Sequence, residues 1–475
     1  MKLSTMKILV KKGDVTDAPV GYVRICFTDK PKGVKRFIKE KGVETLEIGI
    51  GKPAEMNVRK FIILCRAVVN VAKTNTCKKI AVQFDQNLFT NLQAVAPARL
   101  AQLMAENFEM ANFEFNAFKT KPKEGWDTVE EILVFAPDVR EVTAAVQKGL
   151  EIGRAINACR TLANTPGGDM TPTLLAKAAR AAVKGLPVTV TTLGVKEMQK
   201  LGMGAVLGVA KGSSEAPTFT ILKYQGGKGK PVVLVGKGVT FDSGGLNLKS
   251  SNSIYEMHMD MSGGAAVIHA VALAARLKLK CSVVGLIPAV ENMPGNNAVR
   301  PGDVLTSLSK KTIEVLDTDA EGRLILADAL TYAKRFDPAV VIDAATLTGA
   351  AMIALGLHAS ALITRDDTLA QELAEAGESS GDYVWRLPLW DEYADRVKGT
   401  FADLKNVPGG STSRYGGSID GGMFLWQFAK ELDCPWAHLD IAPRMTAAPG
   451  DELAEGAAGE PVRLFFRFIE GRSKQ

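Results

Sequence analysis

Three short clusters of charged residues stand out because their types and spacing could do chemistry. They are the strings VGKGVTFDSGGLNLKS, MHMDMSGGAAV and LDTDAEGRLILADAL. Their chemically capable members are Lys237, Asp242, Lys249, Asp260, Asp319, Glu321 and Arg323. Glycines accompany these residues, and a glycine lets the backbone approach a ligand closely.

The carboxylates of these clusters favour a site for two divalent cations. Several carboxylates at one place repel one another, or are costly to bury, unless a cation compensates them. Oxygen-rich ligand sets suit hard or borderline metals, and bridging carboxylates hold two ions ~3.5 to 4 Å apart. For a single aspartate such as Asp319, a helix N-cap is the better interpretation. Asp-x-Glu-x-Arg after an apolar strand, together with two further clusters, favours the metal site.

The elements that must position these clusters can be predicted from the apolar runs. Four largely apolar runs lie at residues 232–235, 283–287, 313–316 and 340–342, and Glu314 is the one charged residue in them. Such runs are typical of a central, mostly parallel sheet that is covered by helices on both faces. The first cluster follows the first run, and the third cluster follows the third. Ligands of such sheets bind beyond the carboxyl ends of the strands, where both clusters are expected.

The chain is predicted to contain two unequal α/β domains. Residues 1–140 alternate short apolar runs with helix-like stretches and carry no chemical motif. Apolar residues then recur in steps of three and four from Val142 to Cys159, which predicts a linking helix over residues 141–164. Residues 165–475 form the larger domain, and they hold all three clusters.

Composition narrows the class of protein. The chain has 475 residues, of which 46% are apolar and 23% charged, and this excludes disorder, collagen and coiled coil. A net charge of +6 is too dilute to require nucleic acid, so such a partner is not favoured. The six cysteines form no Cys-x-x-Cys pair, which suits a reducing compartment. The N-terminus has no secretory pattern, and we expect a cytoplasmic protein without a membrane partner.

The three clusters also resemble a known family. GKGVTFDSGGLNLK, ENMP followed by RPGDVLTS, and TDAEGRLILADALTYA are similar to motifs of the leucyl aminopeptidases, which are cytosolic two-metal exopeptidases. NTPGGDMTP, ATLTGA, GGSI and WAHLDIA extend the likeness over roughly residues 155–445. The resemblance implies an enzyme that releases N-terminal amino acids, preferentially leucine and other apolar residues, by means of a metal-activated water.

The resemblance also implies a role for each charged residue. One metal would be held by Lys237, Asp242, Asp260 and Glu321. The second would be held by Asp242, Glu321, and the side chain and carbonyl of Asp319. The metals would be zinc or manganese, with magnesium and cobalt as alternatives.

Two further residues and an apolar pocket are implied for catalysis and substrate binding. Lys249 would polarise the scissile carbonyl, and Arg323 would hold a bicarbonate ion that acts as general base. The first side chain of the peptide would enter a pocket formed by Met257, Thr346, Gly349, Ala442 and Met445. The family assembles as hexamers, so the resemblance implies a homohexamer.

This sequence departs from the family pattern close to the site. His258 stands where Lys or Arg is common, and Asp317 stands where Asn is usual. An extra carboxylate near the metals would alter metal preference or the binding of the substrate amine. Asp420, Pro443 and Glu460 also differ from the usual residues.

Two other functions compete with the aminopeptidase interpretation. A DNA-binding or scaffolding protein could use the same fold, and a Cys-Gly dipeptidase would use the same chemistry on another substrate. A serine-hydrolase elbow at residues 377–381 is disfavoured because the polar helix-like QELAEA precedes it instead of a strand. His269 and His438 are expected in the core or in supporting roles.

Overall fold

The computed structural model describes residues 6–31, 33, 35–85, 88–410 and 415–473, and the chain divides into two compact units. Unit 1 comprises residues 1–158 and 449–455, and unit 2 comprises residues 159–448 and 456–475. The boundary lies inside helix α3 (Val139–Ala163). The apolar spacing predicted a helix over residues 141–164, and α3 covers residues 141–163 of that segment.

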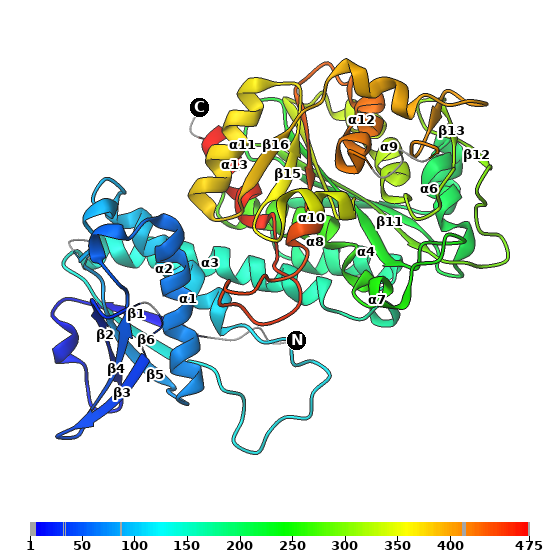
Figure 1. The fold of residues 1–475 in the computed structure, drawn as a ribbon. Coiled ribbons are helices and arrows are strands. Elements are labelled where there is room, and N and C mark those ends of the chain that lie inside the picture. Colours follow the sequence, from blue (N-terminus) through cyan, green and yellow to red (C-terminus); the bar gives the residue numbers. More distant parts are fainter. Residues whose placement is uncertain (1–5, 32, 34, 86–87, 411–414, 474–475) are drawn as a thin grey trace. The chain divides into compact units, whose positions relative to one another are not determined.

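Unit 1 is built on a six-stranded sheet (Figure 1). Its strands are β1 (Lys7–Lys11), β2 (Val23–Thr28), β3 (Lys35–Glu40), β4 (Val43–Gly49), β5 (Lys79–Gln83) and β6 (Glu131–Phe135). Their order is β1-β6-β5-β2-β4-β3, and every pair is parallel except β3 with β4. Helices α1 (Val58–Thr74) and α2 (Pro97–Asn112) pack against each other and contribute to one apolar core with the sheet. Asn57 caps α1 by accepting the Lys60 N–H.

Unit 2 is built on a nine-stranded mixed sheet. Its strands are β7 (Val188–Leu193), β8 (Thr218–Tyr224), β9 (Val232–Gly236), β10 (Gly238–Asp242), β11 (Val283–Asn292), β14 (Val340–Ala345), β15 (Ser360–Ile363), β16 (Val384–Leu387) and β18 (Trp436–Asp440). The order is β16-β15-β18-β14-β9-β11-β8-β7, with β10 paired to β11. The central pairs β18–β14, β14–β9, β9–β11 and β11–β10 are parallel.

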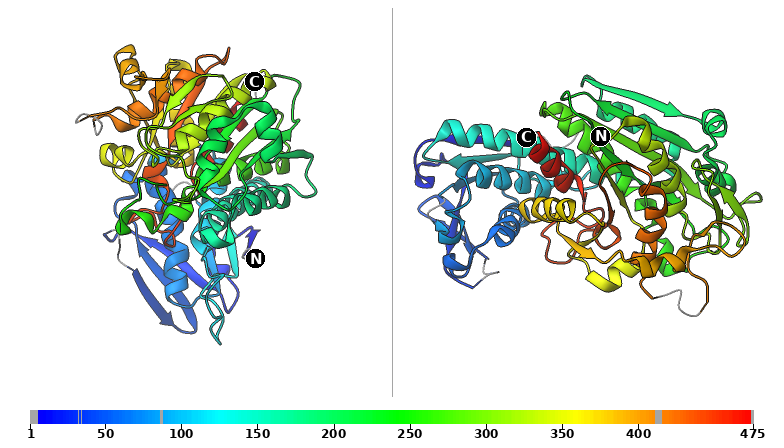
Figure 2. Two further views of the ribbon diagram at one scale, coloured as in Figure 1. Left: turned by 90° about the vertical axis from the view of Figure 1, so that its right-hand side faces the viewer. Right: turned by 90° about the horizontal axis from the view of Figure 1, so that it is seen from above.

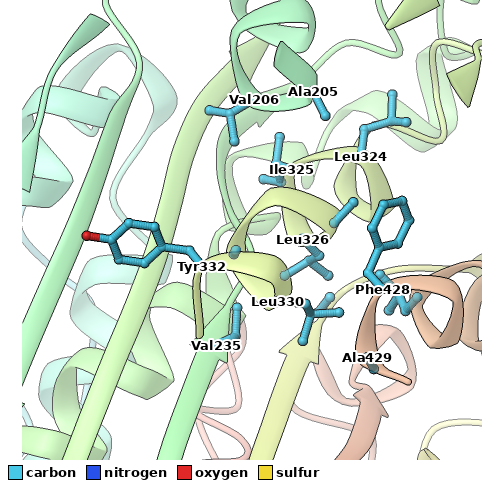
Figure 3. Close-up of a cluster of buried hydrophobic side chains, with 14 of the residues drawn as sticks. Ala205, Val206, Val235, Leu324, Ile325, Leu326, Leu330, Tyr332, Phe428 and Ala429 are labelled. Carbon is cyan, nitrogen blue, oxygen red and sulfur yellow. The ribbon is translucent and has the colours of Figure 1, made fainter. Parts of the chain in front are cut away.

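Helices cover both faces of this sheet (Figures 1 and 2). They are α4 (Pro172–Ala182), α5 (Val195–Leu201), α6 (Gly204–Val209), α7 (Ser251–Ile254), α8 (Ser262–Arg276), α9 (Gly322–Ala333), α10 (Gly349–Leu355), α11 (Asp367–Ser380), α12 (Gly417–Ala429) and α13 (Val462–Arg472). Side chains of α6, α9 and α12 form a buried apolar cluster with Val235 of β9 (Figure 3). The predicted α/β fold class, with a central mostly parallel sheet, is confirmed.

One strand prediction was wrong in its location. The run 313–316 was expected in the central sheet, but β13 (Thr312–Glu314) belongs to a separate three-stranded sheet with β12 (Val304–Thr306) and β17 (Leu404–Lys405). A turn that includes Lys310, with a φ of 71°, folds β12 back onto β13 as an antiparallel pair. An apolar run indicates only that a strand is buried. A small side sheet that packs on the core buries its strands just as the central sheet does.

Two further findings concern the chain as a whole. Within the described ranges, no helix is both long and apolar enough to cross a membrane.

The C-terminal segment 449–455 is part of unit 1. There, Arg66 Nη1 donates to the Asp451 carbonyl at 3.0 Å, and Asn70 Nδ2 donates to the Glu452 carbonyl at 2.9 Å.

Candidate metal centre

The first loop of the site is placed by close contacts of the backbone. Lys237 lies between β9 and β10, and its N–H donates to the Ala344 carbonyl of β14 at 3.1 Å. A Cβ on Gly236 would lie 2.4 Å from the Gly263 carbonyl oxygen, and a Cβ on Gly263 would lie 2.1 Å from that of Ala344. Glycine is therefore needed where β9, β14 and the start of α8 meet.

The charged residues of all three clusters meet in two groups. Lys237 Nζ lies 2.7 Å from Asp260 Oδ2 and 2.8 Å from Glu321 Oε1. Lys249 Nζ lies 2.9 Å from Asp242 Oδ2 and 2.6 Å from Asp319 Oδ1. Lys237 also donates to the Thr346 carbonyl at 2.9 Å. The structure thus brings together every residue of the implied ligand set.

Three of these carboxylates have the spacing that a metal ion needs. One oxygen each from Asp242, Asp319 and Glu321 lie within 4.8 Å of one another. Asp319 Oδ1, Glu321 Oε1 and Asp260 Oδ2 are buried atoms, and among the described residues each faces a lysine ammonium group at 2.6 to 2.8 Å. Oxygens with unused lone pairs fit a hard or borderline divalent cation.

The electrostatics of the group also fit a bound cation. Burial and the neighbouring Asp242 carboxylate raise the pKa of Asp319 to about 7, although Lys249 opposes the rise. Burial likewise raises the pKa of Asp260 and of Glu321. Four carboxylates face only two ammonium groups here, and an added positive charge would relieve their mutual repulsion.

The carboxylates around Lys237 favour the protonated, positively charged form of its side chain. Its burial by itself would lower the pKa, but the carboxylates of Asp260, Glu321 and Asp242 outweigh that effect and raise the pKa above its usual range. A lysine ligates a metal only as the neutral amine, so a cation at this site must compete with the proton on Nζ.

Arg323 is the second residue of α9, two positions after Glu321. Its guanidinium is buried, and Nη1 donates to the Asn406 carbonyl at 2.6 Å. Burial lowers the pKa of Arg323, and the carboxylates of Asp420 and Glu321 oppose that shift. Its Nε is a buried donor without a hydrogen-bond partner in the described part of the chain, which leaves one direction open for an anionic ligand.

The implied pocket residues lie on elements that border the site. Thr346 Oγ1 donates to Asp260 Oδ1 at 2.6 Å, so this residue touches the candidate ligands directly. Gly349 begins α10, which packs against the short helix η10 (Ala442–Arg444), and Met445 follows that helix. Met257 begins another short helix, η7 (Met257–Met259), which ends one residue before Asp260.

The two departures nearest the site have distinct environments. Asp317 Oδ1 accepts the Asp319 N–H at 2.9 Å, so this carboxylate shapes the loop that carries a candidate ligand. His258 is half-buried in η7, and burial lowers the pKa of its imidazole.

Sequence reasoning missed three polar residues that support the site. Asn292 Nδ2 donates to Asp242 Oδ1 at 2.8 Å and to the Thr318 carbonyl at 2.9 Å. Thr318 Oγ1 donates to the Gly244 carbonyl at 2.6 Å. Asn406 contacts both Asp317 and Arg323. Asn292 lies in the string ENMP, which could have indicated it, whereas Asn406 follows a two-residue strand that gave no signal.

Comparisons with known proteins agree over most of the chain. Residues 157–466 match the model of the catalytic domain of the cytosol aminopeptidase family, and residues 38–122 match that of its N-terminal domain. A "Probable cytosol aminopeptidase" from Azoarcus sp. is 44% identical over 431 residues, which are 90% of this chain and 84% of that protein. One from Aromatoleum aromaticum is 47% identical over 369 residues, 76% of this chain and 72% of that protein.

Solved structures are similar along nearly the full length. A mutant of tomato leucine aminopeptidase has a TM-score of 0.87 at 27% identity, and the match covers 99% of this chain and 97% of that one. The bottromycin maturation enzyme BotP in complex with Mn has a TM-score of 0.85 at 32% identity, with 95% and 100% covered.

Proposed function

This chain belongs to the cytosol aminopeptidase family, and we propose that it is a metal-dependent leucyl aminopeptidase. Membership makes it an aminopeptidase, a hydrolase of peptide bonds. The proposal adds a preference for N-terminal leucine and other apolar residues. It also adds two divalent cations, Mn²⁺ or Zn²⁺, whose ligands would be Lys237, Asp242, Asp260, Asp319 and Glu321.

One observation carries the proposal. Oxygens of Asp242, Asp319 and Glu321 lie within 4.8 Å of one another at a place where burial raises the pKa of two of these groups. Bound there, the cations would lower the pKa of a water molecule and accept the free amine of the peptide. The complex of BotP with Mn is support from a relative of the same fold.

Lys249 is the group best placed to act on the scissile carbonyl. Its ammonium borders Asp242 and Asp319, yet 14% of its side chain is exposed, so it can reach a bound peptide. The nearby carboxylates raise its pKa above the usual range, although burial alone would lower it. A permanently charged donor would stabilise negative charge that develops on the carbonyl oxygen.

Arg323 would hold the base that receives the proton of the water. A guanidinium binds a planar oxyanion such as bicarbonate in two parallel hydrogen bonds. The hydrogen bond of Nη1 to the Asn406 carbonyl orients the guanidinium, and the unpartnered Nε is a donor available for such an anion.

The substrate's first side chain would be received next to Thr346. The proposed pocket consists of Met257, Thr346, Gly349, Ala442 and Met445. Two methionines, an alanine and a glycine offer an apolar surface without charge, which suits leucine better than lysine or aspartate.

A panel of substrates tests this function. With Mn²⁺ present, we expect leucinamide to be cleaved with a higher kcat/KM than lysinamide, and N-acetyl-leucinamide to remain intact. Equal rates on the free and the acetylated compound would refute the exopeptidase mode. Cys-Gly belongs in the panel, because a higher kcat/KM on Cys-Gly than on leucyl dipeptides would favour the dipeptidase role.

Assembly and location complete the proposal. We propose a location in the cytoplasm, since the relatives are named cytosol aminopeptidases. We also propose a homohexamer, which rests on the resemblance to the leucyl aminopeptidases. Light scattering should then report about six times 50.8 kDa. A monomer with full activity would contradict the assembly.

A further inference from the structure

The side chain of Asn406 is fully buried beside the loop that carries the candidate ligands. Its Oδ1 accepts the Leu316 N–H at 2.8 Å and, at 3.4 Å, the Asp317 N–H. Its Nδ2 donates to the Asp317 carbonyl at 2.6 Å and, at 3.4 Å, to the Ala320 carbonyl. One side-chain amide therefore binds four backbone groups between residues 316 and 320.

The same residue also reaches Arg323. The carbonyl of Asn406 accepts a hydrogen bond from Arg323 Nη1 at 2.6 Å. Its own N–H donates to the Glu314 carbonyl of β13 at 3.0 Å, which fixes its backbone. Asn406 therefore contacts the third cluster at two places, which are the loop before Asp319 and the guanidinium of Arg323.

The restraint continues from Asn406 to the candidate ligand. Asn406 holds the backbone of Asp317, and the Asp317 carboxylate accepts the Asp319 N–H at 2.9 Å. The position of Asp319 is therefore set through two consecutive hydrogen bonds. Only a side chain that donates and accepts at the same time can satisfy both the Leu316 N–H and the Asp317 carbonyl.

We propose that Asn406 is a positioning residue, which holds Asp319 and Glu321 in register with Arg323 for the binding of metal. This inference rests on the proposed function, because it concerns residues that act on the metals and on the base. Substitution of a residue that orients a metal ligand through hydrogen bonds typically changes metal affinity or activity by about 10- to 100-fold.

Asn406→Asp is the most informative variant. It keeps the shape and the acceptor for Leu316, but it turns the donor into an oxygen that faces the Asp317 and Ala320 carbonyls. Asn406→Ala is the second variant, which removes the side-chain bonds without adding charge. It keeps the inference testable if Asn406→Asp does not fold.

Asn112→Asp in unit 1 is the matched control. Asn112 is buried, its Oδ1 accepts the Val129 N–H and its Nδ2 donates to the Val129 carbonyl, each at 2.8 Å. The control therefore loses the same kind of buried amide donor, away from the three clusters in sequence.

Titration calorimetry of the metal-stripped proteins with Mn²⁺ gives a readout that is independent of activity. For the Asn406 variants we expect affinity to fall by about 10- to 100-fold. With saturating Mn²⁺ we also expect kcat to fall while KM for leucinamide stays within about twofold. Asn112→Asp should lower Tm and leave the affinity unchanged.

Two outcomes overturn the inference and are distinguishable. Wild-type affinity and kcat in a folded Asn406 variant would refute the positioning role alone. A wild-type chain that bound no Mn²⁺ would refute the proposed function, and this inference with it.

Discussion

Gly322→Ala should damage the metal centre through a single methyl group. Gly322 is the first residue of α9 and follows Glu321. A Cβ at this position would lie 2.7 Å from Lys237 Cε and 2.8 Å from both Cδ and Nζ. Carbon atoms in contact prefer about 3.5 Å or more, so Lys237 would have to move by about 0.8 Å.

That displacement is large compared with the contacts it would disturb. Lys237 Nζ lies 2.7 Å from Asp260 and 2.8 Å from Glu321, and a shift of about 0.8 Å takes such pairs beyond hydrogen-bond range. Each charge-assisted bond contributes about 1.5 to 3 kcal/mol. A misplacement near 1 Å at a reacting centre costs about 10²-fold in rate, and we expect at least that loss of kcat/KM.

The assay is leucinamide hydrolysis over a range of Mn²⁺ concentrations, together with Mn²⁺ affinity and Tm. Gly471→Ala is the control, because a Cβ on Gly471 of α13 would meet nothing within 4 Å. There, alanine should stabilise the helix by up to about 1 kcal/mol and leave activity unchanged. Normal affinity and turnover in Gly322→Ala would refute the view that tight packing holds Lys237 in place as a ligand.

Three further changes test separate parts of the account. Asp242→Asn should abolish binding of both metals in equilibrium dialysis, since this carboxylate is a proposed bridge; retention of two ions would refute the bridge. Lys249→Met should retain the metals and lower kcat by about 10²- to 10³-fold, and stopped assays at saturating leucinamide measure this. Burial raises the pKa of Glu460 to about 7 from an ordinary value of 4.5, so its folded form binds the proton more tightly and stability falls as pH rises between those values. Glu460→Gln should flatten the dependence of Tm on pH in that window. An unchanged slope would contradict the raised pKa of Glu460.

The ligand set could be predicted from the sequence because its residues stand in short strings that follow strands or precede helices. Lys237 follows β9, Asp242 ends β10, and Glu321 directly precedes α9. The positions after β9 and at the end of β10 lie at one edge of the mostly parallel sheet, and Glu321 reaches the same place from the start of α9.

The supporting contacts could not be predicted, because they join residues far apart in the chain without a local pattern. Asn406 is 83 residues from Arg323, whose guanidinium it binds. Segment 449–455 is held to α1 by hydrogen bonds from Arg66 and Asn70 across more than 380 residues. The strand at 313–316 was assigned to the wrong sheet for a related reason, since its apolar residues specify burial and not a partner strand.

The central claim is that two cations at the cluster of Asp242, Asp319 and Glu321 activate the water that releases an N-terminal residue. Titration of the metal-stripped protein with Mn²⁺, while leucinamide hydrolysis is followed, tests it most directly. The account predicts no activity without metal, binding of two ions per chain, and full activity only after both have bound. Full activity in the stripped protein, or with a single ion per chain, would contradict it.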